Sequence, residues 1–225
     1  MKFRNLFAQI YLAACLLAAC GLAAAFSADW RIDQNSQCLA TGGFHPQTQT
    51  VPVDPISTAK GCGVLRPIKV TQFGTAAGPV ALSQPMTLTC EMVRAMEQWL
   101  DKAVQPAATR ILRSPVSGLS NGPGYVCRTR NSKKGAKISE HGFGNATDIM
   151  ALHLANGERI SIEKNWPASL KLTLKRSSRF IRDMRSGACE IFSTVLTPEG
   201  DAFHQDHMHF DLARHGRKGT YKLCK

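Results

Sequence analysis

The chain has 225 residues, a formal net charge of +12 at pH 7, eight cysteines and seven histidines. Its 44% hydrophobic and 20% charged residues are ordinary for a soluble globular protein and exclude a disordered or fibrous chain. This length is sufficient for one domain with a buried core, with or without an extension.

The first residues are typical of an export signal. Two basic residues precede a mostly apolar run over residues 10–26, which is short for a membrane span. Leu17-Ala18-Ala19-Cys20 resembles the lipobox of bacterial lipoproteins, whose cysteine is lipidated. An uncleaved membrane anchor, or cleavage after Ala25 or Ala28, fits the same stretch. We therefore expect residues 1–28 to direct export to the periplasm or cell envelope, with a lipid or an anchor as possible membrane attachment.

Beyond this signal, six cysteines remain: Cys38, Cys62, Cys90, Cys127, Cys189 and Cys224. An even number in an exported chain indicates up to three disulfides, and six cysteines allow 15 pairings. Their long spacings exclude a zinc knuckle of the CxxC type. Although Cys127 lies near a histidine motif, we expect it to be structural rather than a metal ligand.

The positive charge persists in the exported part. Removing Lys2 and Arg4 lowers the net charge from +12 to +10. Such a chain is attracted to anionic polymers, which include peptidoglycan with its carboxylates, teichoic acids, lipid headgroups and nucleic acid. No nucleic-acid motif and no aromatic residues interleaved with basic ones accompany the charge, so no nucleic-acid partner is expected. A monomer is expected.

The first half of the chain predicts an extension, a hairpin and a helix. Residues 29–60 are polar and turn-rich, which indicates an irregular extension attached through Cys38. Short β-branched runs broken by Gly and Pro over residues 63–82 predict a hairpin. A helix should follow a Thr87 or Thr89 cap and end between Ala103 and Pro106. Its helical spacing is carried by Leu88, Met92, Ala95, Met96, Trp99 and Leu100.

The second half predicts mainly strands. Alternating apolar residues over 146–154, a type I′ turn at Asn156-Gly157 and a return over 159–162 form the clearest hairpin. Other strands are expected over 111–116, 191–196 and 208–212, a loop over 120–124 and a helix over 170–184. Strands and helices do not alternate regularly, so we predict an α+β domain over residues 61–225, with a central antiparallel sheet flanked by helices.

Four of the seven histidines fall into two short motifs, which run from Ser139 to Asp148 and from His204 to Asp211. Zinc accepts imidazole and carboxylate ligands, and a catalytic site keeps three protein ligands and one open position. Gly142 and Gly144 allow the chain after His141 to bend towards the strand that carries Asp148. His207 and His209 stand two apart on a predicted strand, so one can bind the metal while the other lies beside its water. These motifs predict a metal site.

The remaining histidines, His45, His153 and His215, are interpreted as ordinary surface or core residues. Alternation along the strand from Asp148 places His153 on the opposite face from the site.

Both motifs resemble known families. The first is similar to the SxHxxGxAxD element of zinc peptidases of the lysostaphin, D-Ala-D-Ala peptidase and hedgehog superfamily, and the second is similar to its HxH. Its longer His-x2-His-x-His form resembles the penicillin-insensitive murein endopeptidases. Over residues 62–224 the chain resembles the bacterial extensin-like C-terminal family. The residues that carry this resemblance are Gly61-Cys62-Gly63-Val64, Cys127-Arg128-Thr129-Arg130-Asn131, 139–149, Thr194-Val195-Leu196 and 204–212.

The resemblance implies roles for the motif histidines and their neighbours. The residues that match the three zinc ligands are His141, Asp148 and His209. His207 matches the general base, and His204 matches an additional active-site histidine. Ser139 is expected to hold the loop. Asp211 either orients a ligand histidine or lies at a strand end in solvent.

More loosely, the resemblance implies that Arg128 or Arg130 holds a substrate carboxylate or the transition-state oxyanion. Zinc would lower the pKa of a water molecule, and His207 would accept its proton.

The implied fold is a hedgehog- or D-Ala-D-Ala-peptidase-like zinc fold stapled by disulfides. The implied activity is that of a zinc metallopeptidase, a carboxypeptidase or endopeptidase that cuts amide bonds in peptidoglycan peptides. One alternative is a non-catalytic, zinc-stabilised binding module of the cell wall or envelope, as in hedgehog signalling domains. A second is a disulfide-framed envelope protein without a metal, which leaves both histidine motifs unexplained.

Overall fold

The structure is a computed structural model that describes residues 30–166 and 175–225. The predicted signal over residues 1–28 lies outside the described residues. Within these two ranges, no helix is long and apolar enough to cross a membrane.

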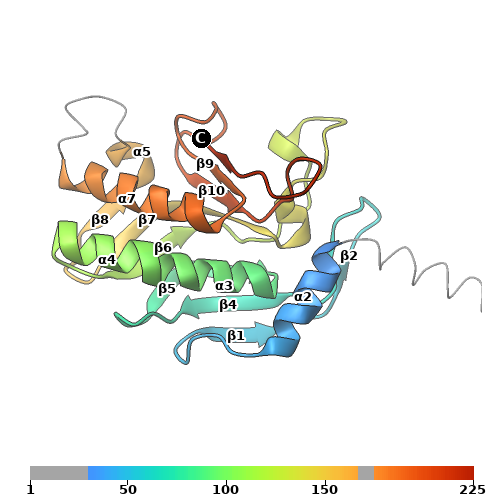
Figure 1. Ribbon diagram of the computed structural model, residues 1–225, viewed down its shortest axis with the longest axis horizontal. Helices are drawn as coiled ribbons and strands as arrows, with labels where there is room; N and C mark the ends of the chain where they lie inside the picture. Colours follow the sequence, from blue (N-terminus) through green and yellow to red (C-terminus); the bar gives the residue numbers. More distant parts are fainter. Residues whose placement is uncertain (1–29, 167–174) are drawn as a thin grey trace, which may run out of the picture.

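Nine of the described strands form one mixed sheet in the order β1-β4-β5-β6-β7-β10-β9-β11, with β8 paired to β7 (Figure 1). Their bounds are β1 (Gln49–Pro52), β4 (Ile68–Phe73), β5 (Val80–Leu88), β6 (Val116–Asn121), β7 (Ala146–Leu154), β8 (Arg159–Ser161), β9 (Thr194–Leu196), β10 (Met208–Asp211) and β11 (Leu223–Cys224). A separate two-stranded sheet consists of β2 (Ile56–Ser57) and β3 (Gly63–Val64).

The prediction of an α+β fold is confirmed, but the sheet is mixed and not antiparallel as predicted. Strand β5 pairs with β6 in parallel, and β11 pairs with β9 in parallel. Parallel neighbours need a long crossover, and residues 90–112 provide one between β5 and β6. The crossover is helical and packs back onto the sheet, as in other strand–helix–strand units.

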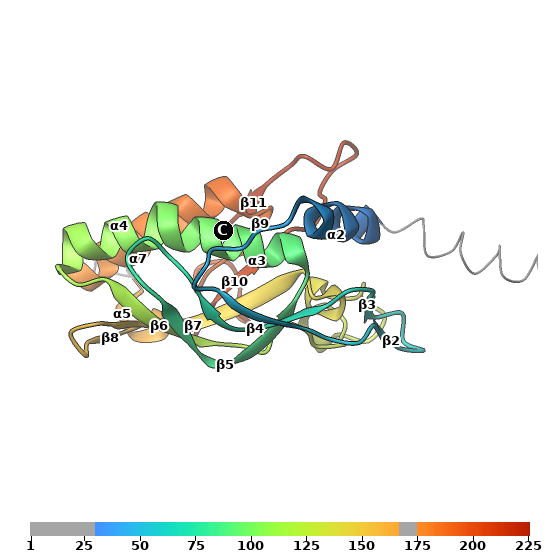
Figure 2. The same cartoon turned by 90° about the horizontal axis from the view of Figure 1, so that it is seen from below.

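Helices cover one face of the sheet. In Figure 2, α3 (Cys90–Trp99), α4 (Gln105–Ala107) and α7 (Arg176–Ile191) lie along the same side of β4 to β7. The core between these layers is rich in aromatic rings: the rings of Phe192 and Phe210 are stacked with their centroids 4.7 Å apart, and Trp99 meets Phe210 edge-on. Trp99 also donates a hydrogen bond from Nε1 to the carbonyl of Met184, so its polar group is satisfied although it is buried.

The helix that was expected to end by Pro106 continues to Leu112. It passes from α3 into a π-helical turn (Leu100–Val104), then α4, then a second π-helical turn (Ala108–Leu112). A proline breaks an α-helix because its ring meets the carbonyl four residues earlier, whereas the wider π-helical turns on both sides of Pro106 accommodate it. The helix therefore occupies residues 111–112, and the strand that was predicted over 111–116 begins only at Val116.

The start of this helix is capped by Thr89, one of the two predicted caps. Met92 donates its backbone N–H to Thr89 Oγ1 at 3.3 Å. We expect Thr89→Ala to lower the free energy of unfolding by about 1 kcal/mol, because it leaves a helix N–H without its acceptor. Chemical denaturation measures this change. Thr109→Ala, at an exposed position of the same helical segment, is the matched control and should have little effect; equal losses in both variants would contradict a capping role.

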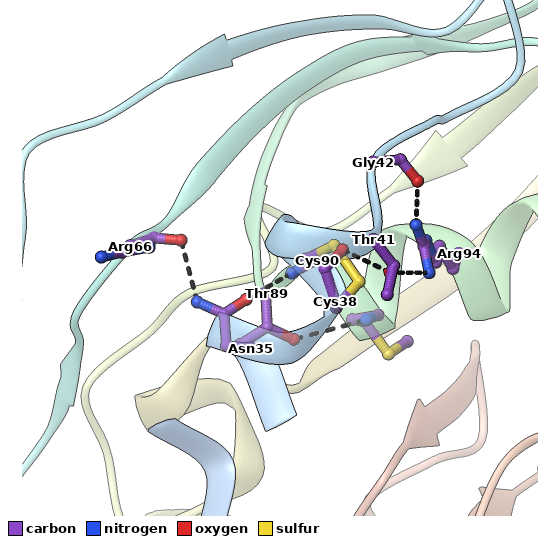
Figure 3. Close-up of a disulfide and its surroundings, with 9 residues drawn as sticks. Asn35, Cys38, Thr41, Gly42, Arg66, Thr89, Cys90 and Arg94 are labelled. Carbon is purple, nitrogen blue, oxygen red and sulfur yellow. Dashed lines mark hydrogen bonds between the residues drawn. A yellow bond between two sulfur atoms is a disulfide. The ribbon is translucent and has the colours of Figure 1, made fainter. Parts of the chain in front are cut away.

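The extension before residue 61 is more regular than predicted. Residues 30–41 form α2 (Trp30–Thr41), and β1 pairs with β4 at the edge of the main sheet. Few apolar side chains stabilise α2; its buried residues are Asn35 and Cys38. The helix is attached instead through a disulfide to Cys90, as expected for Cys38 (Figure 3).

The described chain contains three disulfides, which confirms the prediction from six cysteines. The pairs are Cys38–Cys90, Cys62–Cys127 and Cys189–Cys224. Because Cys127 is oxidised, it is not a metal ligand. Three disulfides are typical of proteins that fold in an oxidising compartment.

The remaining predicted elements are confirmed with shifted bounds. Strands β7 and β8 form the expected hairpin. A type I′ turn needs a positive φ at both central residues, but only Gly157 has one, of 87°, and the φ of Asn156 is not positive, so the turn is of another type. Of the helix expected over 170–184, residues 170–174 lie outside the described residues, and α7 continues to Ile191. Consequently β9 begins at Thr194. A short helix α5 (Ile162–Asn165) follows β8.

Candidate metal centre

Two neighbouring strands carry Asp148 and His209 opposite each other. The two residues are Cα partners in the antiparallel ladder between β7 and β10. On β10, Met208 and Phe210 point into the core, so His209 between them points to the face without helices. Asp148 does the same beside buried Ile149. Register and alternation thus bring the imidazole and the carboxylate to one place.

His141 comes from a 3₁₀ turn, η4 (Glu140–Phe143), just before β7. The turn ends at Gly144, whose φ of 62° is a left-handed conformation that favours glycine. Gly142 lies against the Cys62–Cys127 disulfide: an added Cβ would be 3.0 Å from Cys62 Sγ. The two glycines therefore allow the bend that was predicted for this motif.

The three predicted ligands converge. His141 Nε2 lies 3.2 Å from Asp148 Oδ1 and 3.2 Å from His209 Nδ1, and the last two atoms are 2.9 Å apart. One ligand atom from each residue lies within 4.8 Å of the other two. Both histidines are buried, with 1% and 7% of their surface exposed. This group can hold a metal ion, as the two motifs predicted.

The far sides of both imidazoles have fixed partners. His141 Nδ1 donates to the carbonyl of Gly124 at 2.6 Å, and His209 Nε2 donates to Asp211 Oδ2 at 3.1 Å. These partners assign the tautomers and turn the other nitrogen of each ring towards the shared centre. Metal-binding histidines have such outer partners, so the donor set fits a metal ion. Asp211 is buried and bonded to His209, so its interpretation as a strand-end carboxylate in solvent was wrong.

His204 and His207 stand beside this group. The ring centroid of His204 lies 5.0 Å from that of His207 and 5.7 Å from that of His209. His207 Nε2 is 3.7 Å from Asp148 Oδ1. Each of the two has a carboxylate at Nδ1: Asp201 at 2.6 Å for His204 and Asp206 at 2.7 Å for His207. The second motif thus adds two further histidine–carboxylate pairs to the centre.

A cavity of about 140 Å³ opens next to the centre. Its lining includes Arg128, Arg130, His204, His209, Asp211 and His215. The two predicted arginines therefore face the same space as the histidines. Sequence reasoning missed His215, which hydrogen-bonds Thr194 at 2.6 Å, because it belongs to neither motif. Ser139 also lines the cavity, but it makes no capping hydrogen bond through its side chain, so its role in holding the loop stays a prediction.

The position of His153 differs from the prediction. Strand β7 carries an irregularity opposite β6, and the core residues change from Ile149 before it to Leu152 after it. Because three residues separate these two, simple alternation fails and its phase changes. His153 therefore faces away from the core, as Asp148 does, and the prediction that it lies on the opposite face was wrong. His153 bonds Ser120 at 2.8 Å.

The charges at the centre depend on pH. Burial alone raises the pKa of Asp148, but hydrogen bonds with His141 and His209 outweigh it and hold the pKa well below 3.8. Burial alone lowers the pKa of His209, but hydrogen bonds to Asp148 and Asp211 outweigh it and raise the pKa from 6.5 to about 9. At neutral pH and without a metal ion, His209 is therefore a cation between two carboxylates. A metal ion bound at this group would take the place of its Nδ1 proton.

The metal-free protein should lose stability as the pH rises. Because the pKa of His209 is raised on folding from 6.5 to about 9, its contribution is complete below pH 6.5 and is lost as the pH passes through about 9. The loss is on the order of 3 kcal/mol. Denaturant unfolding of chelator-treated protein, at about pH 6 and about pH 10, measures it. His209→Gln should flatten this slope; an equal slope in both proteins would contradict the assignment.

A family model described as the C-terminus of extensin-like proteins matches residues 36–225. The chain belongs to this family. The extensin-like match begins within α2, upstream of the residues that carry the resemblance in the sequence, and it includes all three donors of the metal centre. No curated protein and no solved structure matches the chain.

Proposed function

We propose that this extensin-like protein is a zinc-dependent hydrolase that cuts amide bonds in peptidoglycan peptides. The observation that carries the proposal is the meeting of three donor atoms from His141, Asp148 and His209, with both rings oriented from behind by Gly124 and Asp211. Two imidazole nitrogens and one carboxylate oxygen suit zinc, and three protein ligands leave a position for a reactant. The resemblance of both motifs to zinc peptidases supports the same conclusion.

When bound, zinc supplies Lewis-acid chemistry: it polarises a carbonyl group and lowers the pKa of a water molecule. The neighbouring histidines would move the proton. His207, whose Nδ1 is held by Asp206, presents Nε2 towards Asp148 and would accept a proton from the attacking water, then return it to the leaving amine. His204, held by Asp201, lies next to it as the additional active-site histidine.

Substrate binding is assigned to the arginines of the cavity. Arg128 and Arg130 line the space beside His204 and His209, where a guanidinium group can bind a carboxylate through two parallel hydrogen bonds or stabilise the oxyanion. Peptidoglycan stem peptides carry free carboxylates, and a net charge of +10 beyond the predicted signal favours this anionic partner. Export to the periplasm or cell envelope agrees with the three disulfides.

A second candidate is a zinc-stabilised binding module that does not turn over its ligand. The observation that favours it is the donor group itself, because three converging ligands from two strands and a turn can stabilise the fold around a metal ion without any reaction. Such a module would still bind peptidoglycan. Removal of zinc would lower its melting temperature without abolishing any reaction.

The test is hydrolysis of purified sacculi by the zinc-loaded protein. We expect the release of new amino ends, seen as shortened or uncross-linked muropeptides after the treated sacculi are digested with a muramidase. There should be none after treatment with a chelator, and they should return when zinc is added back. Equal release with and without zinc would contradict metal-dependent hydrolysis. Binding to sacculi without any release would favour the binding module.

A further inference from the structure

Helix α2 comes from a distant part of the chain and contacts the turn η4 (Glu140–Phe143), which carries His141 and is called the metal-ligand turn below. Arg31 Nε donates to Glu140 Oε2 at 3.0 Å, and Arg31 Nη2 donates to Glu140 Oε1 at 2.6 Å. The two residues are 109 positions apart. The side chain of Glu140 is 3% exposed and that of Arg31 is 19% exposed, so this two-point ion pair is largely buried. Glu140 directly precedes the ligand His141.

The same arginine also contacts the other end of the turn. Its guanidinium carbon lies 4.2 Å from the ring centroid of Phe143, the last residue of η4, and 4.5 Å from that of Trp30. Asn145 Nδ2 adds a hydrogen bond to Glu140 Oε2 at 2.8 Å. Arg31 thus contacts the first and the last residue of a four-residue turn whose second residue is His141.

Helix α2 is itself fixed to the core. The Cys38–Cys90 disulfide joins it to the start of α3. Asn35, buried on the same helix, accepts a hydrogen bond from the N–H of Cys90 at 2.7 Å and donates to the carbonyl of Arg66 at 3.1 Å (Figure 3). The position of Arg31 is therefore set by covalent and hydrogen-bonded contacts that do not involve the metal-ligand turn.

We propose that Arg31 is a positioning residue for the metal centre: through Glu140 and Phe143 it holds the turn in the orientation that directs His141 Nε2 at Asp148 and His209. A planar guanidinium that forms two parallel bonds fixes direction as well as distance. A metal site loses affinity when the groups that orient its ligands move. Arg31 lies outside the family-matched residues 36–225, so the segment before the matched domain completes the site. The inference rests on the proposed metal site, not on hydrolysis.

The test compares zinc affinity and the cobalt absorption spectrum of the full-length protein and its Arg31 variants. We expect Arg31→Gln to bind zinc about 10–100-fold more weakly. Arg31→Lys keeps the charge without the two-point geometry and should restore only part of the affinity. The matched control is Arg110→Gln, which removes an exposed ion pair of 2.6 Å with Asp183 and should leave zinc binding unchanged.

A purely structural role would give a different result. If Arg31→Gln lowered the melting temperature while its zinc affinity and cobalt spectrum matched those of the wild type, the proposal would be overturned.

Phe143→Leu tests the same contact with a milder substitution: it removes one aromatic ring that contacts Arg31 and should weaken zinc binding about 2–5-fold. Wild-type protein that binds zinc but releases nothing from sacculi would refute the proposed hydrolase and leave this comparison valid.

Discussion

Replacing His209 with alanine should abolish stable zinc binding and, with it, the release of new amino ends in sacculi. Its Nδ1 is one of three converging donors, and the two that remain, on His141 and Asp148, leave an incomplete site. The loss of affinity should exceed the 10–100-fold typical for loss of an outer partner. Elemental analysis after dialysis measures the metal content.

The matched control for this variant is His153→Ala. His153 lies on the same strand as Asp148 and also faces away from the core, but it bonds Ser120 and is not part of the donor group. The His153→Ala protein should bind one zinc ion with wild-type affinity. His209→Ala that kept stoichiometric zinc would show that the metal is held elsewhere, and the proposed centre would be wrong.

The meeting of the three donors at the candidate metal centre was predictable because its signal is local. The motif around His141 and the motif around His209 each combine ligand residue types with the glycines or the two-residue spacing that brings them to one side. Strand β7 was predicted with its observed bounds for the same reason, although the irregularity within it, which changes the phase of the alternation before His153, left no local signal. The rest of the chain only has to pair β7 with β10 in the register that places Asp148 opposite His209.

The features that the sequence did not reveal depend on contacts between distant residues. Helix α2 has weak apolar periodicity and is stabilised by the Cys38–Cys90 disulfide, and sequence alone allowed 15 pairings. The ion pair between Arg31 and Glu140 spans 109 positions and leaves no local pattern. The sequence also did not reveal the parallel pairing of β5 and β6. Pro106 normally ends a helix, but here the helix continues past it to Leu112, so the crossover is longer and β6 begins later than predicted.

Replacing His207 with alanine should separate the two effects that the His209 variant combines: zinc stays bound while hydrolysis falls about 10²–10⁴-fold. His207 is not one of the three converging donors, yet its Nε2 lies 3.7 Å from Asp148 Oδ1, at the edge of the centre. Its side chain is 18% exposed, so the substitution should leave the core unchanged. The rate at which new amino ends appear in sacculi, at equal zinc content, measures the effect.

The outer carboxylate gives this prediction a finer test. Asp206 holds Nδ1 of His207 at 2.7 Å, so Asp206→Asn should lower the rate by a smaller factor, because the base remains but its orientation is less restrained. Asp183→Asn, which alters a carboxylate of the distant exposed ion pair with Arg110, should leave the rate unchanged. An unchanged rate in His207→Ala with full zinc content would assign the proton transfer to another group, and His204, 5.0 Å away between ring centroids, would be the next to replace.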